Sequence, residues 1–117
     1  MAEAVAIVDA IIQVETGGTG NCKLKGGSGE SGCMQYMPST WAYHSTEVTG
    51  EVIPLTDGNE RYVATQVISW WLAEGLTPEE ASLKWNSGGL THRKGTNKHG
   101  IAYDTYAYVD KFSSYYR

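Results

Sequence analysis

The stretch AVAIVDAIIQVE, residues 4–15, decides the fold of this chain. Its apolar side chains recur every three to four residues, so that one stripe collects Ala4, Val8, Ile11, Ile12 and Glu15. This spacing is typical of a helix with one buried face. The sequence therefore predicts a helix over residues 4–15 that carries a carboxylate at the end of its buried stripe.

A carboxyl group in that position is a candidate general acid. Burial disfavours its charged form, and the negative end of a helix dipole disfavours an added negative charge, so both effects raise the pKa of Glu15. Gly17 and Gly18 supply the helix stop that places Glu15 in the last turn. A carboxyl group that stays protonated near neutral pH can give its proton to a departing oxygen. The alternative is that Glu15 turns out to solvent where the helix frays.

The composition is that of an ordinary soluble globular protein. With 117 residues, of which 41% are hydrophobic and 19% charged, we expect a single domain over residues 1–117. No apolar run reaches the length of a membrane span, and the opening segment carries Glu3 and Asp9 without a basic leader. We therefore expect neither a transmembrane helix nor a signal peptide. The net charge of −4 argues against nucleic-acid binding as the main role.

The segment 83–103 differs from the rest of the chain because it contains no acid. A solvated loop accounts for such a charge run, and so does a surface that receives an anionic polymer. The basic residues in it are Lys84, His92, Arg93, Lys94, Lys98 and His99.

Two cysteines, Cys22 and Cys33, bracket the loop 23–32. A disulfide between them would contribute roughly 2–3 kcal/mol by restricting the unfolded chain, and it would indicate an oxidising compartment. The alternative is two reduced thiols, with Cys33 as a small buried hydrophobe. A zinc site that uses both cysteines and His44 matches no common spacing, so we expect no metal.

The remaining elements follow from turn and capping signals. Residues 16–32 hold seven glycines and read as an irregular loop with room for a short hairpin. Pro38 begins a short helix to about His44, and residues 45–56 read as loop. A capping-box pattern at 57–60, with Asp57 as the cap, opens a helix to about Glu74.

Two further helices complete the fold. A second capping box at 77–80 opens a helix to about Asn86, and Asp104 or Thr105 can cap a final helix. The pair Trp70-Trp71 lies at helical spacing with Val63 and Val67, which favours the core over a ligand platform. We expect a mainly α domain of about five helices with little or no β.

Three short blocks follow one another along the chain: VET at 14–16, GCMQYMPST at 32–40 and ASLKWNSG at 81–88. They resemble motifs of the soluble lytic transglycosylases, lysozyme-like enzymes related to goose-type lysozyme that cut the glycan of bacterial peptidoglycan. The family motifs are a Glu-Ser that ends the first helix, a Gly-Leu-Met-Gln followed by Met-Pro-x-Thr, and a helix that ends in Tyr-Asn-Ala-Gly. A weaker fourth match is Tyr108-Val109 in a terminal helix that ends in tyrosines.

The resemblance implies a lysozyme-like fold with a glycan-binding cleft and Glu15 as the single catalytic acid. The chain departs from the motifs at Thr16, where Ser is usual, at Cys33, where Leu is usual, and at Trp85, where Tyr is usual. Trp85 removes a phenolic hydroxyl that lies close to the acid in the family, since an indole can donate but not accept. The candidates to replace that hydroxyl are Tyr103, Tyr106 and Tyr108.

The family mechanism also implies roles for other side chains. Gln35 and Asn86 would orient the N-acetyl group and nearby sugar hydroxyls. Met34 or Met37 would form part of the sugar-binding wall. The alternative for both, at their three-residue spacing, is packing, which the sequence favours for Met34. Trp85, Tyr103 and Tyr108 complete the expected substrate-binding set.

Two acids are candidates for a second carboxylate. Glu30 lies in the glycine-rich loop, where solvation is the alternative to a catalytic role. Asp104 precedes the final helix, where capping is the alternative.

The expected reaction is cleavage of the bond between N-acetylmuramic acid and N-acetylglucosamine without water, which leaves 1,6-anhydro ends. The alternatives are a goose-type muramidase that uses water, and an inactive glycan-binding or structural module of a phage or secretion assembly. The expected partner is peptidoglycan, the expected location is the cell envelope, and no cofactor is implied.

Overall fold

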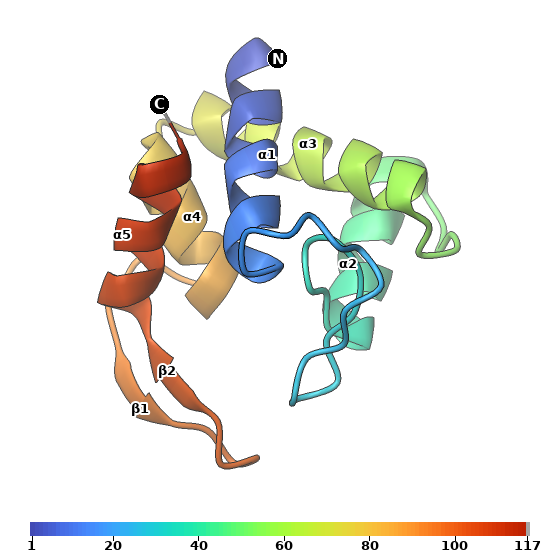
Figure 1. The fold of residues 1–117 in the computed structure, drawn as a ribbon. Helices are drawn as coiled ribbons and strands as arrows, with labels where there is room; N and C mark the ends of the chain where they lie inside the picture. The colour runs from blue at the N-terminus through green and yellow to red at the C-terminus, as the bar shows by residue number, and fades with distance from the viewer. Residues whose placement is uncertain (117) are drawn as a thin grey trace.

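The computed structural model describes residues 1–116, which form five helices and one antiparallel hairpin (Figure 1). The mainly α class predicted from the sequence is confirmed. None of the helices in the described part is long and apolar enough to cross a membrane. The elements are α1 (Ala2–Glu15), α2 (Pro38–Thr49), α3 (Asp57–Ala73), α4 (Pro78–Ser87), β1 (Lys94–Thr96), β2 (Ala102–Asp104) and α5 (Thr105–Tyr115).

Helix α1 stands at the centre of the fold, with α4 and α5 on one side and α2 on the other, while α3 passes behind it (Figure 1). The four apolar residues of its predicted stripe are buried, as expected: Ala4, Val8, Ile11 and Ile12. Ile7, which the stripe did not include, is completely buried as well. All of them pack in the same core as Ile68 of α3 and Phe112 of α5. Full burial of such side chains stabilises the fold by about 1.5–3 kcal/mol each, so α1 is the element around which the core assembles.

Two of the predicted helix starts are confirmed by their hydrogen bonds. The Thr77 hydroxyl accepts from the backbone N–H of Glu80 at 3.2 Å, and the Glu80 carboxylate accepts from the backbone N–H of Thr77 at 2.9 Å. Asp104 Oδ1 accepts from the backbone N–H groups of Tyr106 and Ala107 at 3.0 and 3.2 Å. Asp104 is therefore the cap of α5.

Helix α2 is longer than predicted. The sequence favoured a loop from residue 45 onward, whereas the helix continues to Thr49. Ser45 is completely buried on the inner face, and Val48 packs against the core. Gly50, with φ +89°, ends the helix in the left-handed conformation that glycine adopts most easily.

The hairpin was also not predicted, because its two strands are short and exposed and show no apolar alternation. Lys94 pairs with Asp104 and Thr96 with Ala102. At the tip, Asn97 Oδ1 accepts from the backbone N–H groups of His99 and Ile101. The side-chain amide of Asn97 thus takes the part of a backbone turn.

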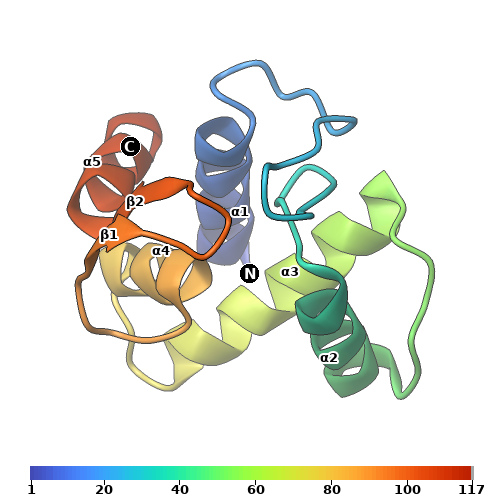
Figure 2. The same cartoon turned by 90° about the horizontal axis from the view of Figure 1, so that it is seen from below.

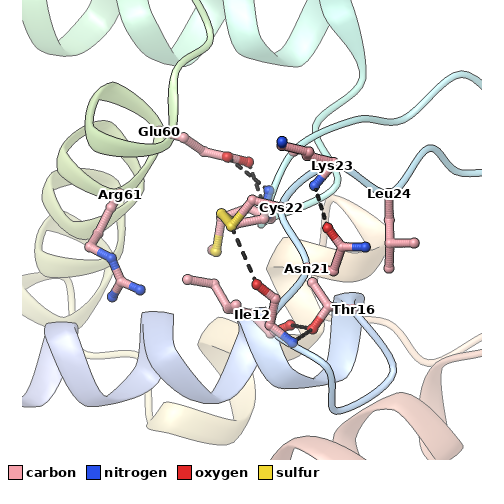
Figure 3. Close-up of a disulfide and its surroundings, with 12 residues drawn as sticks. Ile12, Thr16, Asn21, Cys22, Lys23, Leu24, Glu60 and Arg61 are labelled. Atoms are coloured by element: carbon pink, nitrogen blue, oxygen red, sulfur yellow. Dashed lines mark hydrogen bonds between the residues drawn. A yellow bond between two sulfur atoms is a disulfide. The ribbon is translucent and has the colours of Figure 1, made fainter.

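The capping box predicted at 57–60 is wrong. Thr56 is the cap of α3, and its hydroxyl accepts from the backbone N–H of Asn59 at 3.2 Å. Glu60 instead points inward and is only 1% exposed. Its carboxylate accepts from the backbone N–H groups of Cys33 and Met34 at 2.9 and 2.7 Å, which joins α3 to the loop beside the disulfide (Figure 3).

The loop between α1 and α2 has two further ties. Cys22 and Cys33 form the expected disulfide (Figure 3), which removes the thiolates that the zinc alternative required. At the start of the loop, the Thr16 hydroxyl donates to the carbonyl of Ile12 at 2.7 Å and accepts from the backbone N–H of Gly20 at 2.9 Å. The segment is therefore bonded to α1 at its start and to α3 near its end, and the disulfide joins two points within it.

The Glu60 carboxylate makes Gly32 sensitive to substitution. A Cβ at Gly32 would lie 2.6 Å from both carboxylate oxygens of Glu60, and the φ of Gly32 is +89°. We expect Gly32→Ala to lower the free energy of unfolding by about 3 kcal/mol, measured by thermal or urea denaturation. Gly29→Ala is the matched control, because Gly29 has φ +97° but open space around it. Equal losses for the two variants would show that the contact with Glu60 contributes nothing.

Candidate active site

Two adjoining hollows, of about 720 and 700 Å³, meet at the end of α1. Four residues line both: Glu15, Glu30, Asn86 and Ser87. We call the first hollow the aromatic half, because its walls include Tyr36, Tyr43, His44, Trp70, Trp71 and Trp85. The second is the hairpin half, whose walls include Arg93, Asn97, Tyr103, Asp104, Tyr108 and Lys111. Together they form one groove with Glu15 at its centre.

The two halves are built by different parts of the chain. Helices α2, α3 and α4 contribute most of the aromatic half, and the hairpin and α5 contribute most of the hairpin half. Helix α2 and the hairpin lie on opposite sides of α1 (Figure 2). The position of Glu15 in the last turn of the central helix is what places it between them.

Glu15 is half-buried, and its Oε2 accepts a 2.6 Å hydrogen bond from the hydroxyl of Tyr108. Burial raises the pKa of Glu15 to about 7; the Tyr108 hydrogen bond opposes this rise, and the charge of Glu30 adds to it. The predicted direction is therefore confirmed, with burial as the largest cause. The alternative in which Glu15 turns out to solvent is wrong, because Tyr108 on α5 holds its carboxyl group.

Tyr108 supplies the phenolic hydroxyl that Trp85 cannot. The Trp85 indole N–H donates instead to the carbonyl of Met34 at 3.3 Å, while the ring lines the aromatic half. Tyr103 lies on β2 in the wall of the hairpin half, and Tyr106 is exposed and stacks on His92. Of the three tyrosines named from the sequence, only Tyr108 bonds to the carboxyl group of Glu15 within the described residues.

The prediction that Met34 contacts substrate is wrong. Met34 is completely buried in the core, because Glu60 holds its backbone and turns its side chain inward.

Met37 is 37% exposed and lines the aromatic half, so its position agrees with the expected sugar-binding wall. Asn86 is exposed and lines both halves.

Gln35 also lines the aromatic half, in an unusual backbone conformation with φ +52°. This left-handed conformation costs a residue other than glycine about 1–2 kcal/mol. Both side-chain N–H groups are used, because Nε2 donates to the carbonyls of Leu24 at 3.0 Å and Gly32 at 2.8 Å. The side chain can therefore offer its carbonyl oxygen, as an acceptor, to a molecule in the groove.

Of the two candidate second acids, Glu30 faces Glu15 and Asp104 does not. Glu30 lines both halves of the groove, and its charge raises the pKa of Glu15. Glu30 Oε1 accepts from the backbone N–H of Ser28 at 2.8 Å. It also lies close to Gly26, and Oε1 of Gln35 lies close to the same glycine. Asp104 lies in the wall of the hairpin half, but its carboxylate is engaged as the cap of α5.

The aromatic half contains residues that sequence reasoning missed. The Tyr36 hydroxyl and His44 Nδ1 are 2.8 Å apart, and both rings pack edge-on or tilted against Trp85. Burial lowers the pKa of His44 to about 4, so this imidazole is neutral at pH 7. No local sequence pattern predicted this pair, because Tyr36 precedes α2 and His44 lies within it, eight residues later.

Trp70 corrects another prediction. It was assigned to the core together with Trp71, yet it is 41% exposed and lines the groove beside Tyr43, which is 64% exposed. Consecutive residues on a helix point about 100° apart, so Trp70 and Trp71 face different directions. Adjacent residues such as Ile7 and Val8 do share one core, so no sequence pattern identified Trp70 as the tryptophan that faces the groove. Trp71 is partly buried against the core, with Lys84 Nζ 4.7 Å from its ring centre.

The arrangement combines a proton donor, amides and aromatic faces in one open groove. A carboxyl group with a pKa near neutrality can act as acid and as base at physiological pH. Rings with one apolar face and one polar edge suit the mixed surface of a sugar. The two open halves leave room for a chain that continues on both sides of Glu15.

The hydrogen bond from Tyr108 favours the ionised form of Glu15, so removing this bond changes the pKa of Glu15 in a defined direction. We expect Tyr108→Phe to raise the pKa of Glu15 above its value of about 7, because the carboxylate loses a donor while its burial persists. An NMR titration of the carboxyl carbon measures this change. Tyr103→Phe is the control and should leave that pKa unchanged. A lower pKa in Tyr108→Phe would contradict the assigned balance of burial and hydrogen bonding.

The chain matches none of the protein-family models, curated proteins or solved structures with which it was compared. The groove and the side chains around Glu15 are therefore the observations from which a function is inferred.

Proposed function

We propose that the protein is a peptidoglycan lytic transglycosylase that uses Glu15 first as acid and then as base. The observation that carries this proposal is the carboxyl group of Glu15, with a pKa of about 7, at the centre of a groove open on two sides. The order of the three motif blocks along the chain supports it as well. The substrate is the glycan strand of the bacterial cell wall.

In the first step, the protonated carboxyl group of Glu15 gives its proton to the oxygen that joins N-acetylmuramic acid to the next sugar. The bond from the anomeric carbon to that oxygen breaks, and the oxygen leaves as a hydroxyl group. The N-acetyl oxygen of the substrate stabilises the positive charge at the anomeric carbon, in place of the second carboxylate of most glycosidases. Tyr108 stabilises the carboxylate that Glu15 has become.

In the second step, the ionised Glu15 takes the proton of the muramyl 6-hydroxyl, and that oxygen bonds to the anomeric carbon. The product is a 1,6-anhydro ring, no water is consumed, and Glu15 is protonated again. A pKa near neutrality suits both steps, because neither protonation state is far in free energy from the other at pH 7.

The remaining groove residues would orient the strand. Gln35 accepts a hydrogen bond from the N-acetyl N–H or a sugar hydroxyl, and Asn86 lies where it can reach sugars on both sides of Glu15. Tyr103 lines the hairpin half, and Met37 and Trp85 line the aromatic half. The disulfide between Cys22 and Cys33 supports a location in the cell envelope, where oxidising conditions preserve such bonds.

A second candidate function is a muramidase in which Glu30 positions a water molecule. Glu30 favours this alternative because it lines both halves of the groove and its charge acts on Glu15. The two reactions break the same bond, but only the muramidase leaves a reducing end.

Product analysis tests the proposal. We expect purified peptidoglycan digested by the wild-type protein to yield muropeptides with 1,6-anhydro ends, each lighter by one water than the hydrolysis product in mass spectrometry. Glu15→Gln should abolish turnover and retain binding to the walls, because the amide keeps the shape and has no acidic proton. Reducing ends would establish the muramidase. Absence of cleavage by the wild type, with binding equal to that of Glu15→Gln, would instead identify a glycan-binding module of a larger phage or secretion assembly.

The exposed tryptophan of the aromatic half provides an independent test of glycan binding. We expect Trp70→Ala to weaken binding of soluble glycan fragments by about 2-fold to 10-fold, since a packed aromatic ring contributes about 0.5–1.5 kcal/mol. Titration calorimetry in the Glu15→Gln background measures the change without cleavage. Tyr62→Ala is the matched control, because Tyr62 is 54% exposed on the same helix and is not part of the groove wall. Similar losses for both variants would contradict a role for Trp70.

A further inference from the structure

The carboxylate of Glu60 is buried, and its two oxygens are bound by backbone N–H groups of a distant loop. Cys33 and Met34, whose N–H groups it accepts at 2.9 and 2.7 Å, precede Glu60 by 27 and 26 residues. Gly32 approaches the same carboxylate so closely that a Cβ would lie 2.6 Å from its oxygens. Contacts this close from three consecutive residues show that the loop is fitted to the carboxylate.

The residues that Glu60 holds are the two central residues of a tight turn. The turn is closed by the hydrogen bond from the Gln35 N–H to the Gly32 carbonyl at 3.2 Å. The central N–H groups of such a turn have no partner within it, so an outside acceptor determines how the turn is oriented. Glu60 is that acceptor for both groups.

The turn places Gln35, its last residue, in the wall of the groove. Gln35 is the only residue other than glycine with positive φ in the described chain, and it follows directly after the two held amides. Its Nε2 bonds back to the Gly32 carbonyl at 2.8 Å, so its side chain is fixed to the same turn. The turn also carries the Met34 carbonyl that accepts the Trp85 indole N–H.

We propose that Glu60 is a positioning residue of the active site, which holds the turn 32–35 so that the Gln35 side-chain carbonyl faces the groove beside Glu15. This inference rests on the proposed function for its catalytic readout. Glu60 does not touch the groove, as it lies on the inner side of the turn. It acts through Gln35.

The choice of a carboxylate fits positioning better than stability. A buried charge is costly to desolvate, and an apolar side chain of similar size would fill the same space at lower cost. An apolar side chain, however, would leave the two central N–H groups without a buried partner and the turn without a fixed orientation. The disulfide at Cys33 fixes the position of the turn but not the direction of its N–H groups.

A double-mutant cycle with Glu60→Gln and Gln35→Ala tests the proposal. The amide of glutamine can accept one of the two N–H groups and directs its own NH₂ at the other, so the turn should shift. We expect Glu60→Gln to lower kcat/KM on peptidoglycan by about 10-fold to 100-fold in the wild-type background. In the Gln35→Ala background, the same substitution should lower it by less than about 2-fold, because the group through which Glu60 acts is absent.

Glu80→Gln is the matched control. Glu80 also accepts a backbone N–H with its carboxylate, that of Thr77, but it lies outside the groove. We expect the kcat/KM of Glu80→Gln to equal that of the wild type, measured at a temperature at which circular dichroism shows that all variants are folded. Equal losses from Glu60→Gln in both backgrounds would overturn the proposal and leave Glu60 a purely structural residue. If Glu60→Gln fails to fold, Glu60→Asp, which keeps the charge but shortens the side chain, takes its place in the cycle.

A backbone measurement separates this inference from the proposed function. In NMR spectra of Glu60→Gln, we expect the amide resonances of Cys33 and Met34 to shift and the coupling constant that reports φ of Gln35 to leave its wild-type value. A wild-type protein that cleaves no peptidoglycan would refute the proposed function alone. A Gln35 backbone that is unchanged in Glu60→Gln would refute the positioning role, whether or not the protein is active.

Discussion

The hydrogen bonds between the Glu60 carboxylate and the N–H groups of Cys33 and Met34 are the constraint on which the groove depends. The segment between α1 and α2 has seven glycines and no helix, so ordering it costs more conformational entropy than ordering an average segment of its length. Three ties offset that cost: the Thr16 hydroxyl, the disulfide and Glu60. Of these three, only the last joins the segment to α3.

The pKa of Glu15 results from a balance between elements at opposite ends of the chain. Burial at the end of α1 raises it from 4.5 to about 7, although Tyr108, 93 residues later, donates to the charged form. Because the folded state holds this proton more tightly than the unfolded state does, the free energy of unfolding falls as the pH rises from about 4.5 to 7. The loss is on the order of 2–3 kcal/mol, a substantial part of the stability of a domain of this size. At neutral pH the raised pKa of Glu15 therefore lowers the stability of the fold.

Features with a strong local signal could be predicted from the sequence. The 3.6-residue period gave α1 and its buried face, and the Thr77 and Asp104 caps marked two helix starts. The end position of Glu15 was enough to predict the direction of its pKa shift. Cys22 and Cys33 could be paired because they were the only two cysteines.

The orientations of Glu60, Met34 and Tyr108 could not be predicted, because contacts between residues far apart in the sequence determine them. The pattern at 57–60 fitted a capping box equally well, and only the approach of the turn at 32–35 turned Glu60 inward. Glu60 also orients the turn so that the Met34 side chain is buried in the core, whereas Met37 is partly exposed. The geometry of the turn, which the residue types do not reveal, decides which methionine faces the groove. Tyr108 could be selected from three tyrosines only once α5 was seen to lie beside α1.

The charges around the groove limit how it could bind the glycan strand of the proposed function. The chain carries a net charge of −4, and the aromatic half adds Glu47 and Glu74 to the two central carboxyl groups against a single cation, Lys84. Long-range attraction for an anionic polymer is therefore weak at the aromatic half, and it is screened beyond about 10 Å in any case. The hairpin half differs, because Arg93 and Lys111 line it. In the aromatic half, affinity must come from short-range contacts inside the groove, which the neutral His44 and the exposed rings of Tyr43 and Trp70 can make without charge. Contacts of that kind depend on the shape of the groove walls. Under the proposed function, Glu60 therefore affects the reaction without contacting the substrate, because it fixes the turn that carries Gln35.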